Sequence, residues 1–344
     1  MLIIGCDFHS GFQQLAIFDN LTREIEFKKL RHPAEAAEFY RGLAGKVVVG
    51  MESGCPCQWF RKLLEECGHE LWIGDAARIR AAETRAQKTD RRDAELILKL
   101  MLEGRFPWIW VPTEAERDLR QLLMDRHHRM RMRTKVKNQL QALALNQGVQ
   151  KGRRLWSIAG LQQLRDMPMM EHAARRRDQL LKLLTDLDSQ ILALDLVVRR
   201  QAEAREDARR LMTHPGVGPQ TGLGMVLTVG DVSRFANSKQ LASYLGLTPR
   251  EHSSGGKQRL GHISKQGSSF MRFLLVEAGQ TAARGDDELK RAYRRLAARK
   301  GRAIAKVMVA RRLAVRLYWM LRKGWTYTEL ARHVGKPGSF RGEQ

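Results

Sequence analysis

Two apolar stretches that each end in an acid decide how the first third of the chain folds: LIIGCD at residues 2–7 and KVVVGME at residues 46–52. Both are short and bounded by polar residues, which is typical of buried β-strands. Three strands in succession, followed by alternating helices and strands, predict an α/β layer with a mixed sheet. The other strands are expected at 14–18, 24–30 and 70–73, and the helices at 33–43, 57–67, 76–86 and 90–103.

Four acids in this region predict a metal site. Asp7 and Glu52 end the two strands, and Asp90 and Asp93 stand three residues apart on the last of these helices. If the two strands are neighbours, their acids converge at one edge of the sheet, and an i, i+3 pair projects from one helical face. Converging carboxylates repel one another unless a cation neutralises them, and hard oxygen ligands favour Mg²⁺ or Mn²⁺. Two such ions can support phosphodiester cleavage.

The order of these acids along the chain is that of an RNase H-like, RuvC-type nuclease fold. Simpler interpretations remain open for each residue. Asp90 could be the N-cap of its helix, with Asp93 stabilised by the helix dipole in the first turn. Asp7 could start a β-turn.

The charge of the chain is unevenly distributed. Residues 1–106 hold 16 Lys and Arg against 16 Asp and Glu, so the whole net charge of +24 falls in residues 107–344. A basic excess of this size indicates a polyanionic partner. No apolar run of 18 residues and no signal-peptide pattern is found, so we expect no membrane association and a cytoplasmic, nucleoid-associated protein. The four cysteines form no CxxC pair and are expected to be reduced thiols.

The middle of the chain is expected to be almost entirely helical, with one long helix over 114–146. Leucines and other apolar residues at 180, 184, 187, 191, 194 and 198 follow a 3.5-residue spacing, which indicates a coiled coil or a helix packed within a bundle. Residues 126–137, RHHRMRMRTKVK, carry no acid and predict a track for nucleic-acid phosphates. The alternative is a solvated helix face. The cations of this track are Arg126, Arg129, Arg131, Arg133, Lys135 and Lys137.

The last third opens with Pro215-Gly216-Val217-Gly218, which has the form of a helix–hairpin–helix loop, although such strings are also common turns. A loop of this kind can offer backbone N–H groups of Gly216 and Gly218 to a phosphate. Residues 246–272 are rich in Ser, Gly and basic residues and are expected to form a flexible loop. Its cations are Arg250, Lys257, Arg259 and Lys265.

Seven motifs in a fixed order make the chain resemble the insertion-sequence-110 family of bacterial transposases, which also includes Piv-type DNA invertases. They are IGCDFHS at 4–10, GMESG at 50–54, KTDRRDAELI at 88–97, RTKVKNQLQAL at 133–143, HPGVGPQTG at 214–222, RFANSKQLASYLGLTPREHSSGGKQRLGHISKQGSSFMR at 234–272 and KGRAIAKVMVARRLAVRLYWMLRKG at 300–324. The resemblance covers essentially the whole chain.

The resemblance implies a RuvC-like catalytic domain over 1–110, a coiled-coil linker and dimerisation region over 111–205, a transposase domain over 206–335 and a flexible tail over 336–344. Asp7, Glu52, Asp90 and Asp93 would bind Mg²⁺ or Mn²⁺. The family pattern GLTPxxxxSG implies Ser254 as the nucleophile that forms a phosphoserine link to DNA, with Ser253 as the alternative if the register differs by one.

The resemblance further implies donor and target DNA as partners, a structured bridge RNA as guide, and a homodimer that pairs to a tetramer. Only the charge is compatible with an RNA; no residue pattern indicates one. Three other interpretations stay open: a Holliday-junction-type endonuclease that uses only the acids, a Piv-like invertase that needs no guide RNA, and a non-catalytic nucleic-acid scaffold.

Overall fold

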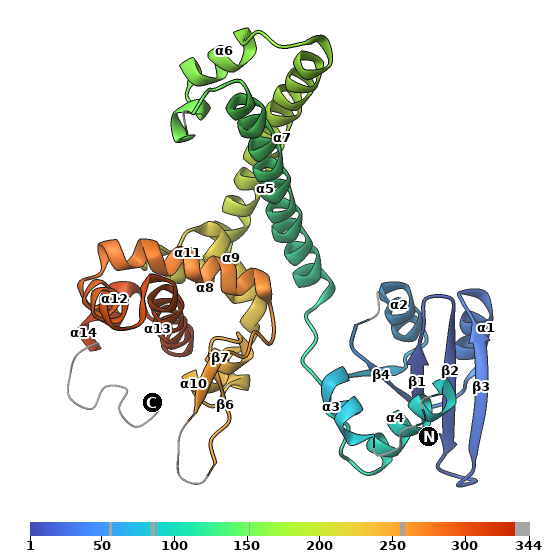
Figure 1. Cartoon of the computed structure of the whole chain (residues 1–344). Coiled ribbons are helices and arrows are strands. Elements are labelled where there is room, and N and C mark those ends of the chain that lie inside the picture. The colour runs from blue at the N-terminus through green and yellow to red at the C-terminus, as the bar shows by residue number, and fades with distance from the viewer. Residues whose placement is uncertain (55–56, 84–86, 88, 151, 255–258, 334–344) are drawn as a thin grey trace. The chain divides into compact units, whose positions relative to one another are not determined.

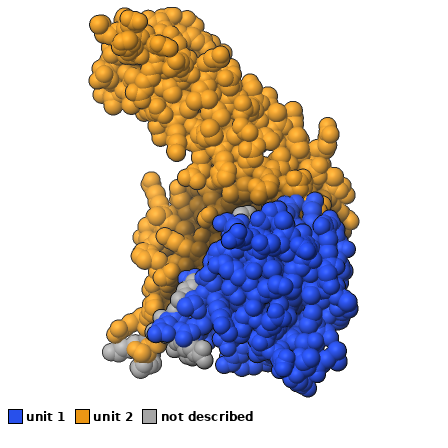
Figure 2. Space-filling view, turned by 90° about the vertical axis from the view of Figure 1, so that its right-hand side faces the viewer, with its two compact units in different colours: residues 1–111 blue, residues 112–344 orange. Residues whose placement is uncertain are grey.

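The computed structural model describes residues 1–54, 57–83, 87, 89–150, 152–254 and 259–333. The chain forms two compact units, Met1–Val111 and Pro112–Gln344, which Figure 2 colours separately. Among the described residues, no helix combines the length and the apolar character that crossing a membrane requires. The described cysteines, Cys6, Cys57 and Cys67, are free thiols.

The first unit is built on a mixed five-stranded sheet in the order β3-β2-β1-β4-β5. β1 pairs antiparallel with β2 and parallel with β4, so the two acid-ending strands are neighbours, which meets the condition for their acids to converge. The RNase H-like α/β layer expected from the sequence is therefore confirmed. Its elements are β1 (Leu2–Phe8), β2 (Phe12–Asp19), β3 (Ile25–Arg31), α1 (Ala34–Gly42), β4 (Val47–Glu52), α2 (Gln58–Glu66), β5 (Glu70–Gly74), α3 (Ala76–Ala82) and α4 (Asp90–Leu102).

Alternation along β1 and β4 gives the sheet two different faces. Ile4 and Cys6 belong to a core cluster that also contains residues of α1 and α2, such as Tyr40 and Phe60. The intervening residue Gly5 faces α4. Helices therefore cover both faces of the sheet, and α4 lies on the face to which Asp7, two residues after Gly5, also belongs.

Helix α4 packs directly on the strands because two glycines leave room for it. A Cβ atom on Gly5 would stand 2.3 Å from the carbonyl oxygen of Ala94, and one on Gly50 would stand 2.2 Å from the sulfur of Met101. At Gly5 no side chain fits without moving the helix, because the contact is with its backbone, whereas at Gly50 the Met101 side chain would have to move. The close packing fixes the first turn of α4 near the ends of β1 and β4.

The second unit is mostly helical, as predicted. Apart from the short β6–β7 hairpin, its described residues form only helices and connections (Figure 1). The division at 205/206 between a linker and a transposase domain stays a prediction. The elements are α5 (Glu114–Asn146), η1 (Gly152–Trp156), α6 (Ile158–Asp166), α7 (Glu171–Ala204), α8 (Glu206–Met212), α9 (Pro219–Val229), η2 (Val232–Arg234), α10 (Ser238–Tyr244), β6 (Pro249–Glu251), β7 (Leu260–Ile263), α11 (Ser269–Gly285), α12 (Asp287–Lys300), α13 (Arg302–Lys323) and α14 (Tyr327–His333).

Helices α5 and α7 lie side by side as an antiparallel hairpin (Figure 1). A capping box between Thr113 and Glu116 starts α5. The apolar seam of α7 is buried within the chain: Leu184 and Leu187 share a cluster with Leu140 of α5. The 3.5-residue spacing thus produces an intrachain hairpin, and this seam is not left free for a second copy.

The β6–β7 hairpin lies where the sequence predicted a flexible loop. Pro249 pairs with Ile263 and Glu251 with Leu260. Glu251 and Leu260 are exposed, so the ribbon has no alternation of buried and exposed residues that a sequence pattern could reveal. At its base, the Arg272 guanidinium of α11 donates to the carbonyl oxygens of Leu245 and Gly267 at 3.3 and 3.2 Å.

Candidate active site and nucleic-acid interface

The described part of the chain contains one group of side chains able to hold a metal ion: Asp7, His9 and Asp90, whose ligand atoms all lie within 4.8 Å of one another. His9 Nε2 stands 3.0 Å from Asp7 Oδ2 and 3.6 Å from Asp90 Oδ1. Asp7 comes from β1, His9 from the turn that follows it, and Asp90 from the first turn of α4. Two of the four predicted acids are therefore brought together.

Asp7 is buried, with 7% of its surface exposed. Burial raises the pKa of its carboxyl, the ion pair and hydrogen bond with His9 lower it, and the negative charges of Asp93 and Asp90 raise it, with a net upward shift. A buried carboxylate under the field of two others is in the situation that a divalent cation relieves. The donor set thus fits a hard metal ion.

Glu52 and Asp93 lie outside the group that falls within 4.8 Å. Glu52 ends β4, one residue beyond the paired positions Cys6 and Met51, so its backbone stands beside Asp7 at the same edge of the sheet. Asp93 is in the first turn of α4 and acts electrostatically on Asp7. Both acids therefore lie near the site but are not part of the group formed by Asp7, His9 and Asp90.

Of the local interpretations of these acids, the placement of Asp93 in the first turn of α4 is confirmed, whereas the other two are wrong. Thr89, whose hydroxyl accepts from Arg92 N–H, is the N-cap of α4, so Asp90 is the first helical residue. Asp7 lies within β1 and pairs with Gln14 of β2, so it does not start a turn.

His9 was not among the site residues predicted from the sequence. Residues i and i+2 of an extended chain share a face, and His9 follows Asp7 by two in IGCDFHS, so alternation could have found it. Its ring also stacks on Phe12 with ring centroids 4.6 Å apart.

The predicted nucleophile and its neighbour differ in their hydrogen bonding. Ser254 is exposed and follows β6 in the hairpin. The Ser253 hydroxyl donates to Glu251 Oε1 at 2.6 Å and accepts from Arg259 N–H at 3.1 Å. For Ser254, no hydrogen bond of the hydroxyl is found within the described segments.

The cations expected beside these serines are exposed at Arg250, Arg259 and Lys265, and Lys257 lies outside the described residues.

Comparison with protein families gives two matches along this chain. Residues 4–147 match a transposase model of the DEDD type found in IS110 elements. Residues 208–294 match the transposase IS116/IS110/IS902 family. The chain belongs to the IS110/IS116/IS902 family of transposases. It is therefore an enzyme of DNA cleavage and strand transfer, DNA is its partner, and its DEDD domain implies a divalent metal.

Curated proteins similar to this chain include transposases and a gene-inverting protein. A probable family 20 transposase of Pseudomonas aeruginosa is 28% identical, over 82% of this chain and 84% of the relative. The transposase for insertion sequence element IS1111A of Coxiella burnetii is 27% identical, over 82% and 78%. A pilin gene-inverting protein of Moraxella bovis is 29% identical, over 57% and 55%.

In the transposase, half of the predicted phosphate track on α5 is engaged within the hairpin. Arg126 pairs with Asp195 of α7 at 3.0 Å, Arg133 pairs with Asp188 at 2.5 Å, and Arg129 pairs with Asp125 at 3.3 Å.

The other three cations of the track are differently placed. Lys137 stands 4.8 Å above the Trp156 ring, and burial, with a smaller contribution from Arg133, lowers its pKa. Arg131 and Lys135 are exposed and, among the described residues, in no ion pair. These two cations are the most available to a nucleic acid.

The predicted helix–hairpin–helix loop joins α8 to α9. Gly216 has φ +83°, and a Cβ there would stand 2.4 Å from the backbone nitrogen of Ala282 in α11, so glycine is required by conformation and by packing. Gly218 is the N-cap of α9, and a Cβ there would meet nothing within 4 Å. Gly216 therefore fixes the loop, while Gly218 is open to a ligand.

A buried charge network beside this loop was not predicted from the sequence. Arg316 of α13 donates to Asp286 Oδ2 and to Glu288 Oε2, both at 2.6 Å. Tyr327 donates to Asp286 Oδ2 at 2.7 Å, and Arg316 approaches His214 Nε2 at 3.4 Å. The network ties the residue before the loop to α12, α13 and α14.

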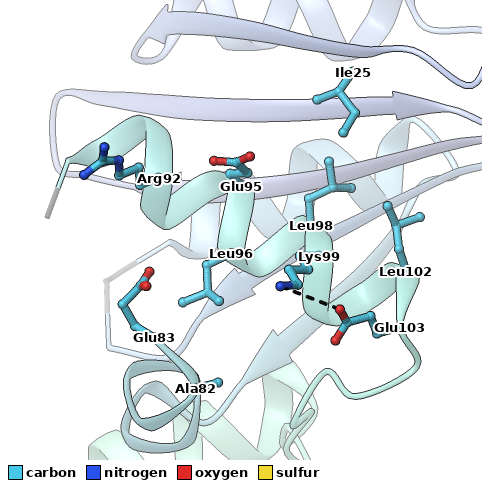
Figure 3. A pocket seen from close by; sticks show the side chains of 10 residues that line it. All are labelled: Ile25, Ala82, Glu83, Arg92, Glu95, Leu96, Leu98, Lys99, Leu102 and Glu103. Carbon is cyan, nitrogen blue, oxygen red and sulfur yellow. Dashed lines mark ion pairs between the residues drawn. The ribbon is translucent and has the colours of Figure 1, made fainter. Parts of the chain in front are cut away.

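A cavity of about 450 Å³ borders α4 in the first unit (Figure 3). Its lining carries both signs of charge, with Arg92, Glu95 and a Lys99–Glu103 ion pair at 3.9 Å. Its lining does not include the acids of the candidate metal site. The cavity is therefore separate from that site.

Proposed function

We propose that the transposase cuts and rejoins DNA with two sets of groups: the acids Asp7, Glu52, Asp90 and Asp93, which hold Mg²⁺ or Mn²⁺, and the hydroxyl of Ser254, which forms a transient phosphoserine link. The observation that carries the first part is the buried Asp7 carboxylate, whose charge is opposed by two further carboxylates and balanced only in part by His9. The family pattern around GLTP supports the second part.

The proposed metal would supply Lewis-acid stabilisation of charge on the phosphate and sugar oxygens. Asp7 and Asp90 offer it carboxylate oxygens, which suit Mg²⁺ and Mn²⁺. His9 is hydrogen-bonded to Asp7 and would act as a positioning residue, since partners of this kind orient ligating groups. An imidazole is not a preferred Mg²⁺ ligand.

In the proposed serine step, Ser254 Oγ forms a bond to the phosphorus of a DNA phosphodiester. One phosphorus–oxygen bond of the backbone breaks, the leaving sugar oxygen takes up a proton, and the serine proton passes to solvent. A sugar hydroxyl of another strand then attacks the phosphoserine, which restores the serine and completes strand exchange. The energy of the phosphodiester is retained in the covalent link.

Replacement of Ser254 by Ala tests this proposal. We expect S254A to lose both recombination and the covalent protein–DNA adduct that is trapped by denaturation during turnover. S253A is the matched control, and it should retain the adduct because the Ser253 hydroxyl is held by Glu251 and Arg259 N–H.

The reverse pattern would assign the nucleophile to Ser253. If S254A cut DNA as fast as the wild type without an adduct, the chain would be a water-using, Holliday-junction-type endonuclease. Unaltered activity after removal of the acids would instead identify a non-catalytic scaffold.

The basic second part of the chain supports a guide RNA in addition to DNA. The net charge of +24 falls entirely in residues 107–344, which leaves room for phosphate contacts to two nucleic acids. Sequencing of nucleic acid that co-purifies with the transposase should return one structured RNA encoded beside its gene. Recombination by protein freed of RNA would contradict this assignment.

A specific observation favours an inversion reaction as the second candidate. The pilin gene-inverting proteins align with this chain at 29% identity. An invertase would recombine two sites within one DNA molecule and would need no guide RNA. The RNA-free assay above separates the two reactions.

A second copy of the chain is the other proposed partner, as a homodimer that pairs to a tetramer. The seam of α7 is used within the hairpin, but Leu192 and Leu196, one turn apart on α7, remain 63% and 62% exposed. Adjacent exposed leucines of this kind support self-association along α7.

A further inference from the structure

Helix α12 and the first residue of α13 carry six exposed cations that belong to none of the predicted nucleic-acid contacts. We name this surface the α12 cationic face; it is formed by Arg291, Arg294, Arg295, Arg299, Lys300 and Arg302, the last at the start of α13. The sequence contains no Asp or Glu from residue 289 to residue 328. Beyond the first turn, which holds Asp287 and Glu288, no acid dilutes the charge of the helix.

The other side of α12 holds the helix in the core. Leu289 and Ala292 are buried, and Leu289 clusters with Ala282 of α11 and Val309 of α13. Figure 1 shows α12 beside α13 in agreement with these contacts. Packing thus fixes the orientation of the helix and keeps the cations in solvent.

Two of the three acids at the start of α12 are engaged with other cations, while Asp287, four residues before Arg291, is exposed and, within the described residues, in no ion pair. Asp286 and Glu288 bind Arg316, and Glu288 also stands 3.8 Å from Arg312. Within the described residues, none of the six cations of the face forms an ion pair. In the α5 track, by contrast, a carboxylate partner is present for each of Arg126, Arg129 and Arg133.

Repulsion among the unpaired arginines destabilises α12 when no ligand is bound. Arg291 and Arg295, and Arg295 and Arg299, are like charges at i, i+4 spacing, which repel on a helix surface. The helix dipole favours cations only in the last turn and so accounts for Arg299 and Lys300, not for the arginines in the middle. A polyanion that lies along the face would offset the repulsion.

We propose that the α12 cationic face binds the phosphate backbone of duplex DNA without reading its sequence. From Arg291 to Lys300 the helical rise gives a length of about 14 Å, which matches about four base pairs of duplex. Five of the six cations lie on one rigid helix, which suits a regular duplex backbone. Arginine is also the side chain best suited to bidentate phosphate contacts.

The test compares two variants with the same change in net charge. R291Q/R294Q/R295Q removes the centre of the face. R153Q/R165Q/R175Q removes three exposed arginines on η1, α6 and α7 that, in the described part of the chain, also lack ion pairs. Binding of a random-sequence 30-base-pair DNA is measured by fluorescence anisotropy over a salt series. Circular dichroism melting establishes that both variants are folded.

We expect the α12 variant to lower the affinity by about 10- to 100-fold at 0.1 M salt. The slope of log affinity against log salt should fall by about 2.7, which corresponds to three lost phosphate contacts at about 0.9 each. The control should leave the slope unchanged, and R291K/R294K/R295K should retain it because the charge remains. Equal losses of affinity in variant and control would overturn the proposal. So would a loss of affinity for a structured RNA hairpin, titrated in parallel, without a loss for the DNA.

Discussion

Asp7 in the first unit and Asp286 in the second are both buried carboxylates, with 7% and 6% of their surfaces exposed. Burial raises the pKa of Asp7, the contacts with His9 lower it, and Asp93 and Asp90 contribute further upward shifts. Burial also acts to raise the pKa of Asp286, but hydrogen bonds from Arg316, Leu289 N–H and Tyr327 outweigh it, and the pKa is lowered.

The opposite pKa shifts indicate that the Asp286 carboxylate stabilises the fold, whereas the Asp7 carboxylate has another role. Every strong donor around Asp286 is supplied by the chain itself, as a buried structural charge requires. Asp7 has one histidine and faces further acids, so its charge is incompletely balanced. The same substitution, Asp to Asn, should therefore have opposite effects at the two positions.

The largest effect is expected from Asp7→Asn. Loss of a metal-binding carboxylate should lower metal-dependent DNA cleavage by about 1,000-fold or more, since several kcal/mol of transition-state stabilisation are removed. The unfolding temperature should rise, because an unfavourable buried charge is also removed. Cleavage assays and calorimetry on the same preparation measure both.

Glu66→Gln, at an exposed position of α2, is the control and should change neither quantity. A D7N protein that was less stable than the wild type would contradict the comparison.

Asp286→Asn should give the opposite sign of stability change. Arg316 would keep its buried charge with a weakened partner, and breaking a buried pair costs about 3–5 kcal/mol. Urea denaturation measures the loss. The neighbouring Asp287→Asn, at an exposed position, should cost less than about 1 kcal/mol. Equal losses in the two variants would mean that the network does not stabilise the fold.

The smallest effect is a pH dependence at His214. Burial lowers its pKa from 6.5 to about 4, against the hydrogen bond to the Pro215 carbonyl. As the pH falls below 6.5, His214 becomes protonated in the unfolded chain, whereas in the folded chain it becomes protonated only near pH 4. Folding stability should therefore fall by about 3 kcal/mol across this window and stay constant above it.

Urea denaturation at pH 7.0, 5.5 and 4.5 measures the His214 effect. His214→Gln keeps a donor and an acceptor but does not titrate, so its decline over the same window should be smaller. An unchanged decline would assign the pH dependence to another histidine.

The sheet of the first unit could be predicted because its pattern is local. LIIGCD and KVVVGME have the composition of buried strands, whereas their parallel pairing was only a condition of the predicted metal site and is found in the structure. The convergence of Asp7 with Asp90 then depended on α4 packing against β1, which Gly5 permits.

The buried charge network around Arg316, the ion pairs of α5 and the β6–β7 hairpin could not be predicted in this way. Nothing near Arg316 in the sequence indicates that Asp286 and Glu288, about 30 positions earlier, neutralise it. The α5 arginines lie in a stretch of sequence without acids, yet three of them are paired across or along the hairpin. The β6–β7 ribbon has no buried face, so periodicity could not reveal it.

The close approach of α4 to Gly5 also bears on the spacing of the acids at the proposed metal site. The backbone of α4 packs against Gly5, which has no side chain and stands two positions before Asp7. The first turn of α4 therefore cannot come closer to Asp7. Mg²⁺ binds oxygen at about 2.0–2.1 Å and Ca²⁺ at about 2.3–2.6 Å. A single added methyl group at Gly5 would push the carboxylates apart and shift the preference toward the larger ion. Ionic selectivity would then be determined by a residue that never contacts the ion.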